Sequence, residues 1–297
     1  MKKKTIKIIL GLLLFILLIA MIMIAYYLIV DIQTKVPKKI EEICQIETKQ
    51  FMGRNIFIVT PKNQEKSDIK ILYFHGGSYV AETSEQHWEF IEQIVNDTGA
   101  TIILPDYPLT PKYTYKDVFK MMVPFYKEII EKVDINNLII MGDSAGGGLG
   151  LALEERIGEE NLPMPAKTIL ISPWLDVRLT NPEIDVIQKN DKELNKETLK
   201  LAGIAYAGED GINSYLVNPI EGDLSKIENV TILTGTYDIL NPDVQILKEK
   251  AEKVGKKIDV KEYEQAGHIW MIERNSSQEL IEQGYQEILK LVMENNK

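Results

Sequence analysis

The chain of 297 residues is 45% hydrophobic and 26% charged, as expected for a globular protein with room for one large domain. Residues 1–40 carry seven lysines and one aspartate, so a net charge of −16 remains for the rest of a chain whose formal charge is −10. This acidic body argues against nucleic acid as a partner, because it would repel phosphate groups. The single cysteine, Cys44, excludes an internal disulfide, and no Cys/His cluster indicates a zinc site.

The amino terminus has the pattern of a membrane anchor. Four lysines among the first seven residues precede an uncharged apolar run from Ile8 to Val30. As a helix this run would be about 34 Å long, against a hydrocarbon core of about 30 Å. A cleaved signal peptide is the alternative, but its apolar region would span only about 7–15 residues. We therefore predict a single-pass, uncleaved anchor over residues 1–30. The lysines before the run slightly outnumber those just after it, which predicts that the domain following the run lies outside the cytoplasm.

Short runs rich in Val, Ile and Leu alternate with amphipathic segments of helical length from residue 54 to the end of the chain. The expected strands cover residues 55–60, 69–74, 101–104, 138–141, 167–171, 230–234 and 258–262. The expected helices cover residues 85–97, 114–133, 145–156, 196–207, 243–254 and 277–294. This alternation predicts an α/β domain over residues 54–297, with a mostly parallel sheet covered by helices on both faces.

Two segments depart from that alternation. Residues 31–53 are rich in Lys and Glu and contain Pro37. We expect them to form a connecting segment with a short amphipathic helix, either leading away from the membrane or belonging to a cap. The long polar segment of about residues 178–218 is expected to be a lid over the site, and a plain surface excursion is the alternative.

The sequence Gly-Asp-Ser-Ala-Gly at residues 142–146 follows an apolar run and precedes a helical stretch. A strand, a sharp turn and a helix in this order form a nucleophile elbow with Ser144 at its apex. Gly142 and Gly146 have the spacing of G-x-S-x-G, which lets strand and helix approach closely. A glycine-rich helix terminus that holds a phosphate is the alternative for this pattern alone. We predict Ser144 as the nucleophile and the amide of Ala145 as an oxyanion donor.

A serine nucleophile needs a general base, and the chain offers three histidines. His268 follows the last expected strand, so it lies at the same sheet edge as Ser144 and is the predicted base. His87 sits in a helical stretch, where a packing or surface role is expected. His75 follows an early strand and precedes Gly76 and Gly77, whose backbone amides can approach a substrate closely enough to bind an oxyanion.

The carboxylate that orients the base is expected in the loop after residues 230–234. Asp238 is the candidate, and Asp243 is the fallback because it can instead begin the following helix. The resulting chain order of serine, acid and histidine is that of the α/β-hydrolases.

The sequence resembles the hormone-sensitive-lipase-like branch of the α/β-hydrolase esterases from about residue 55 to the carboxyl terminus. The motifs that carry the resemblance are HGG at 75–77, DYPLTP at 106–111, GDSAGG at 142–147, SPWLD at 172–176, GTYDIL at 235–240 and His268. This resemblance implies an α/β-hydrolase fold with a helical cap, a catalytic triad and an oxyanion hole. The triad would be Ser144, Asp238 and His268, and the oxyanion donors would be the amides of Gly76, Gly77 and Ala145.

Two positions depart from the family's pattern. Ser78 stands where a third glycine is usual, and Pro108 stands where the family has an arginine. Neither change removes a group that the chemistry needs.

We therefore expect a membrane-anchored serine hydrolase that cleaves short or medium acyl esters and needs no metal or organic cofactor. The chain has neither the phosphate-binding G-x-x-x-x-G-K-[ST] pattern nor the zinc-binding H-E-x-x-H pattern. The same residues would serve a peptidase or a deacetylase of a cell-envelope polysaccharide or lipid. A catalytically silent binding protein on this fold is the alternative outside enzymes.

Overall fold

The structure, a computed structural model, describes residues 13, 31 and 33–294. Its contacts divide the chain into two units, Met1–Ile32 and Gln33–Lys297. The predicted anchor run Ile8–Val30 lies outside the described residues, apart from Leu13. In the part of the chain that the structure does describe, every helix is too short or too polar to cross a bilayer. The second unit carries the fold described below.

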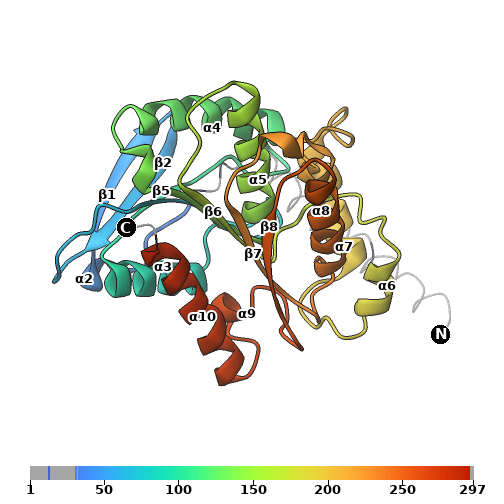
Figure 1. Cartoon of the computed structure of the whole chain (residues 1–297). Coiled ribbons are helices and arrows are strands. Elements are labelled where there is room, and N and C mark those ends of the chain that lie inside the picture. The colour runs from blue at the N-terminus through green and yellow to red at the C-terminus, as the bar shows by residue number, and fades with distance from the viewer. Residues whose placement is uncertain (1–12, 14–30, 32, 295–297) are drawn as a thin grey trace, which may run out of the picture. The chain divides into compact units, whose positions relative to one another are not determined.

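Its centre is an eight-stranded sheet in the order β1-β2-β4-β3-β5-β6-β7-β8 (Figure 1). The strands are β1 (Cys44–Phe51), β2 (Arg54–Pro61), β3 (Lys70–Phe74), β4 (Thr101–Pro105), β5 (Leu138–Asp143), β6 (Lys167–Ile171), β7 (Val230–Gly235) and β8 (Ile258–Tyr263). β2 pairs antiparallel with both β1 and β4, and all other neighbours are parallel. The mostly parallel sheet confirms the expected architecture.

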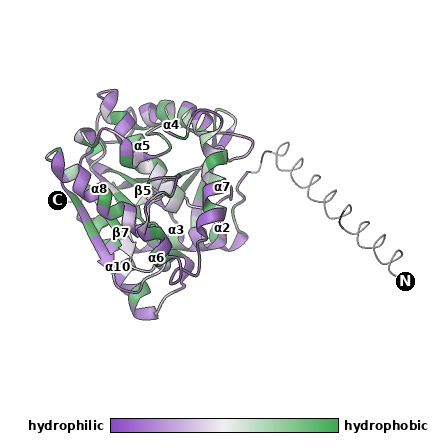
Figure 2. Ribbon diagram, turned by 90° about the vertical axis from the view of Figure 1, so that its right-hand side faces the viewer, coloured by the Kyte–Doolittle hydropathy of each residue, from purple (hydrophilic) through white to green (hydrophobic). Residues whose placement is uncertain are grey.

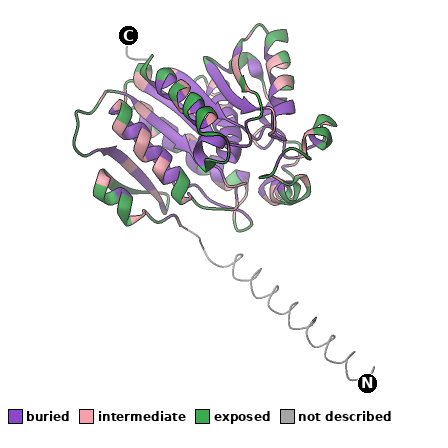
Figure 3. Cartoon of the chain, turned by 90° about the horizontal axis from the view of Figure 1, so that it is seen from below, coloured by how far each residue is buried: buried purple, intermediate pink, exposed green. Residues whose placement is uncertain are grey.

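Helices cover both faces of this sheet. The α-helices are α2 (Lys38–Ile43), α3 (Glu85–Thr98), α4 (Tyr115–Ile130), α5 (Ser144–Glu159), α6 (Glu183–Ile187), α7 (Lys196–Ala207), α8 (Asn241–Lys253), α9 (Trp270–Glu273) and α10 (Gln278–Met293). α4, α5 and α8 lie on one face, and α3, α9 and α10 lie on the other (Figure 1). Figure 3 shows buried strands between helices whose outer sides are exposed, and Figure 2 shows that these outer sides are largely hydrophilic.

The central strands explain why the alternation was visible in the sequence. Every residue of β4, β5 and β6 is buried, because helices cover both sides of a parallel sheet. Such strands are short, nearly continuous apolar runs, which end where the chain turns at the sheet edge.

Residues 31–53 contain the expected short helix and also a strand that the sequence did not predict. The short helix is α2, and the strand is β1, which directly follows it and pairs with β2 at the edge of the sheet. Only Cys44 is fully buried in β1, since an edge strand with one solvent-exposed face needs few apolar residues. The carboxyl-terminal part of the segment therefore extends the sheet, and a role of the segment in a cap stays a prediction.

Candidate active site

The turn from β5 into α5 is a sharp elbow with Ser144 at its apex. The φ angle of Ser144 is 51°, in the left-handed region that a serine rarely adopts. A Cβ atom on Gly142 would lie only 2.4 Å from the carbonyl oxygen of Gly146. β5 and α5 can approach this closely only because residue 142 is glycine. Gly146 allows a similar approach of α5 to β3, since a Cβ atom there would lie 2.0 Å from the Phe74 carbonyl oxygen.

Ser144, His268 and Asp238 form one hydrogen-bonded chain. His268 Nε2 lies 2.9 Å from Ser144 Oγ, and His268 Nδ1 lies 2.9 Å from Asp238 Oδ2. Because Asp238 faces Nδ1, the proton of the neutral imidazole resides there and Nε2 accepts the serine hydroxyl. The other oxygen of Asp238 accepts the amide N–H of Leu240 at 2.9 Å.

The sheet order brings these three residues together although 124 positions separate Ser144 from His268. Ser144 follows β5, Asp238 follows β7, and His268 follows β8, and all three strands run parallel in one half of the sheet. Their carboxyl ends therefore meet at one edge. The three residues are at most 4% exposed, so their contacts are shielded from water.

The environment of His268 favours its charged form. Burial lowers the pKa of the imidazole, but the carboxylate of Asp238 raises it through charge and hydrogen bonding, and the net pKa lies above the ordinary value. A proton taken from Ser144 would thus be held on an imidazolium that Asp238 stabilises.

The oxyanion loop (residues 75–81) follows β3 and lies against the elbow. A Cβ atom on Gly76 would lie 3.0 Å from Ser144 Cβ, so the Gly76 backbone is next to the predicted nucleophile. The carbonyl of Gly77 accepts the amides of Val80 and Ala81 at 3.0 and 2.9 Å, which closes a tight turn. Ala145 lies in the first turn of α5, where helix amides have no intrahelical partner. Gly76 and Ala145 thus lie next to Ser144, Gly77 follows in the same loop, and the role of their amides as oxyanion donors stays a prediction.

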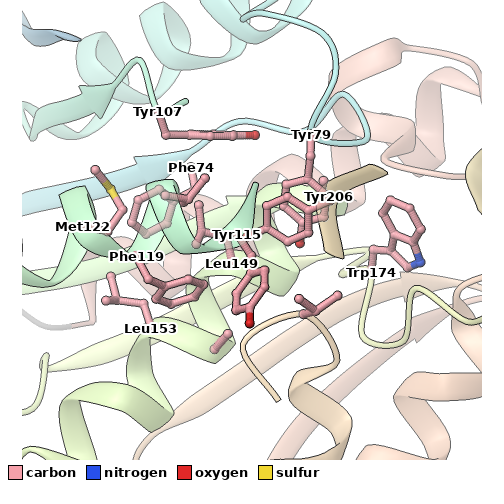
Figure 4. Packing of buried hydrophobic residues seen from close by; sticks show 14 of the residues in the cluster. Phe74, Tyr79, Tyr107, Tyr115, Phe119, Met122, Leu149, Leu153, Trp174 and Tyr206 are labelled. Atoms are coloured by element: carbon pink, nitrogen blue, oxygen red, sulfur yellow. The ribbon is translucent and has the colours of Figure 1, made fainter. Parts of the chain in front are cut away.

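The position without the usual glycine keeps the conformation that glycine favours. Ser78 has a φ of 56° and its neighbour Tyr79 has a φ of 62°, both in the left-handed region. The buried ring of Tyr79 stacks on Tyr206 of α7, with centroids 3.6 Å apart, and lies 5.7 Å from the ring of Trp174 (Figure 4). This packing compensates for the strain of the turn.

The inserted segment (residues 178–218) contains α6 and α7 and contacts the site at two places. Tyr206 reaches the oxyanion loop, as described above, and Asp191 reaches the loop that carries Asp238. Asp191 Oδ2 accepts the amide N–H of Ile239 at 2.9 Å, and Asp191 Oδ1 accepts two amides of its own turn. Sequence reasoning missed Asp191, because nothing in the polar insertion marks the residue that will face a loop 48 positions away. The role of the segment as a lid stays a prediction.

The fallback carboxylate lies apart from His268. Asp243 is in the first turn of α8, and its Oδ1 accepts a hydrogen bond from the Asn181 side chain at 2.9 Å. Burial raises the pKa of Asp243 to about 6. Of the two carboxylates considered, only Asp238 touches the histidine that touches Ser144.

The two remaining histidines are both buried, and His87 is not on the surface. His75 stacks on Tyr107 with centroids 4.5 Å apart, and burial lowers its pKa to about 4, so its ring is neutral. His87 places Nε2 3.0 Å from Oδ2 of Asp143. Sequence reasoning missed this contact, although an aspartate at the end of a wholly apolar strand is a signal, because a buried carboxylate needs a partner.

Over residues 13, 31 and 33–294, no three His, Cys, Asp or Glu side chains are grouped as ligands for a metal ion. The arrangement of the predicted nucleophile, base and backbone donors suits acyl transfer.

Known proteins resemble this chain in sequence and in fold. A family model for the alpha/beta hydrolase fold matches residues 71–272. An esterase from Acinetobacter venetianus is 31% identical over 205 residues, which cover 68% of this chain and 67% of that protein. An acetyl-hydrolase from Streptomyces hygroscopicus is 25% identical over 201 residues, 67% of each protein. The crystal structure of EstE5 soaked with p-nitrophenyl butyrate superimposes with a TM-score of 0.78 at 25% identity, over 90% of this chain and 94% of that one.

The family match extends from β3 to α9 and includes the elbow, the oxyanion loop and the loops of Asp238 and His268. The chain belongs to the α/β-hydrolase-fold family and is a serine carboxylic ester hydrolase.

Proposed function

We propose that the protein hydrolyses short or medium acyl esters through an acyl-serine intermediate on Ser144. The contact of His268 with Ser144 and Asp238, 2.9 Å on each side, is the observation that carries the proposal. A silent binding protein would have no physical need for this buried hydrogen-bonded chain, which costs desolvation energy to assemble.

The residues have the following roles in the proposed reaction. Ser144 Oγ attacks the ester carbonyl carbon while His268 Nε2 takes its proton, and Asp238 keeps the imidazole in the required tautomer. The amides of Gly76, Gly77 and Ala145 donate to the negative oxygen of the tetrahedral intermediate. The bond to the leaving alcohol then breaks, and His268 gives the alcohol its proton. Water attacks the acyl-serine by the same route and releases the carboxylic acid.

The relatives support small acyl groups. EstE5 was soaked with p-nitrophenyl butyrate, and the Streptomyces hygroscopicus relative is an acetyl-hydrolase. The similarity to an acetyl-hydrolase also favours a specific alternative. In this alternative, the enzyme removes an acetyl group from a cell-envelope polysaccharide or lipid. That substrate would suit an enzyme held at the membrane.

The proposed membrane anchor is supported by the sequence alone. The uncharged run Ile8–Val30 is long enough to span a bilayer, and the lysines before it favour an amino terminus in the cytoplasm. Protease added to intact cells should then degrade the catalytic domain and spare a cytoplasmic control protein. Protection of the domain until the membrane is broken would contradict the orientation, and a mature protein that begins near Tyr26 would contradict the anchor.

The chemistry is tested with a fluorophosphonate probe and a p-nitrophenyl ester series from acetate to laurate. The wild-type protein should be labelled and should prefer the shorter esters. Ser144→Ala should keep its circular dichroism spectrum and lose both labelling and turnover, the latter by a factor on the order of 10⁶. Normal turnover in this variant would refute the proposed nucleophile, and a peak at laurate would refute the acyl range.

A further inference from the structure

A second buried aspartate–histidine pair lies beneath the oxyanion loop. Asp143 ends β5, directly before the predicted nucleophile, and His87 lies in the first turn of α3. His87 Nε2 is 3.0 Å from Asp143 Oδ2, and the hydroxyl of Tyr73 donates to Asp143 Oδ1 at 2.6 Å. All three side chains are buried. Each oxygen of this carboxylate therefore has a partner, and the mechanism above uses none of these groups.

The carboxylate of Asp143 lies directly against the backbone of Gly76. A Cβ atom on Gly76 would be 2.2 Å from Asp143 Oδ2 and 3.0 Å from Ser144 Cβ. No side chain fits at this position, so the Gly76 backbone packs against both the carboxylate of Asp143 and Ser144. A shift of Oδ2 would move the Gly76 backbone or leave a gap behind it.

The ring of His87 is held at both nitrogens. The amide N–H of Ser84 lies 3.2 Å from Nδ1, and Ser84 Oγ lies 2.7 Å from the same atom. In the neutral ring Nδ1 accepts the amide, and in the charged ring Nδ1 donates to the hydroxyl oxygen. In both states Nε2 carries the proton that faces Asp143. Burial opposes the charge on His87, but Asp143 outweighs it, so the pKa of His87 is raised and the pKa of Asp143 is lowered.

We infer that His87 is a positioning residue for the esterase reaction, which it serves by fixing Asp143 and, through it, the Gly76 amide beside Ser144. The inference rests on the proposed function of Ser144 and Gly76. An oxyanion donor acts on the transition state and hardly on the bound ester. Misplacing it should therefore lower kcat and leave KM nearly unchanged.

The main test is His87→Ala. Its kcat is calculated per active site, and the active sites are counted by letting the fluorophosphonate probe react to completion. We expect kcat to fall by about 10- to 100-fold, less than the loss of a whole oxyanion donor, with KM within about twofold of wild type. Thr98→Ala is the matched control, because Thr98 Oγ1 donates to the Ile94 carbonyl at 2.6 Å at the other end of α3. It removes a hydrogen bond of the same helix and leaves the contacts of the His87 ring in place, so its kcat should stay within about twofold of wild type.

A conservative variant distinguishes the effect of the His87–Asp143 hydrogen bond from the effect of the volume of the His87 ring. His87→Gln keeps a donor near the position of Nε2 and should recover part of the lost kcat. An equal loss in His87→Gln and His87→Ala would indicate that ring packing alone matters and would overturn the inference. An unchanged kcat per labelled site in His87→Ala would overturn it as well.

A second pair of variants keeps the inference testable if His87→Ala fails to fold. Tyr73→Phe removes the hydroxyl that holds the other oxygen of Asp143, and we expect a loss in kcat of about 3- to 10-fold at constant KM. Tyr126→Phe is its control, since the buried Tyr126 hydroxyl donates to the Pro163 carbonyl at 2.7 Å, on α4 and away from the site. Equal kcat in the two variants would overturn the inference. A wild-type protein that is neither labelled nor active would instead refute the proposed function itself.

Discussion

The ring of Tyr206 in the inserted segment stacks on the ring of Tyr79 in the oxyanion loop, with an angle of 5° between the planes. Tyr79 and its neighbour Ser78 both have left-handed backbone conformations, which need support from their surroundings. The insertion is therefore part of the structure that holds the oxyanion loop in place. Any motion of α7 away from the site would expose Tyr79 and release that support.

Replacing Tyr206 tests this relationship. Tyr206→Ala should destabilise the protein by about 3–5 kcal/mol, since a large buried ring is lost, and should lower kcat because the loop becomes mobile. Tyr206→Phe keeps the stacked ring and removes a buried hydroxyl that has no hydrogen-bond partner in the described part of the chain. Its melting temperature should be equal to or above that of wild type, and its kcat should be unchanged. Thermal unfolding and steady-state kinetics measure both, and a large kcat loss in Tyr206→Phe would contradict the stacking argument.

Exchanging the two candidate carboxylates for amides identifies the partner of the histidine. Asp238→Asn should lower turnover by a factor on the order of 10⁴, because an amide can favour the wrong imidazole tautomer. Asp243→Asn should have little effect on turnover, since Asp243 bonds Asn181 and not His268. Reversed effects would show that Asp243 orients the base.

The pH dependence of kcat/KM follows from His268, which must be neutral to accept the serine proton. Its pKa in the folded protein lies above the ordinary 6.5, so activity should fall as the pH drops through a midpoint above 6.5. The same raised pKa makes the stability of the fold change with pH in the opposite direction to activity. The protonated pair of His268 and Asp238 stabilises the fold below the unfolded-state pKa, and this contribution is lost as the pH rises through the folded-state pKa. A pH–rate profile with its acidic midpoint below 6.5 would contradict the effect assigned to Asp238.

A buried carboxyl on α5 makes stability depend on pH around neutrality. The side chain of Glu154 is fully buried, and burial raises its pKa from 4.5 to about 7. The folded protein therefore favours the protonated carboxyl, so stability should fall as the pH rises through about 7.

Glu154→Gln should remove this dependence, because the amide can still accept the Glu228 amide N–H and carries no charge. At pH 8 the variant should be more stable than wild type by about 1–3 kcal/mol, and at pH 5 the difference should be small. Glu249→Gln, on the exposed side of α8, is the control and should leave the pH dependence as in wild type. Melting temperatures across this pH range measure the effect, and parallel curves for Glu154→Gln and wild type would contradict it.

The sequence by itself determined the features that depend on neighbouring residues. The apolar runs of β3 to β7, the glycines around Ser144 and the order of serine, acid and histidine all follow from local periodicity and turn chemistry. Because parallel strands end at one edge of the sheet, even the proximity of Ser144, Asp238 and His268 could be expected before the fold was known.

Tertiary structure alone decided the features that depend on partners distant in the chain. β1 becomes a strand because β2 offers it an edge, although its own residues are mostly polar and exposed. Asp143 meets His87 across 56 positions, and Asp191 meets the loop of Asp238 across 48. No periodicity encodes such contacts, since a buried polar group is satisfied by whichever element the sheet order and the insertion bring within hydrogen-bond distance.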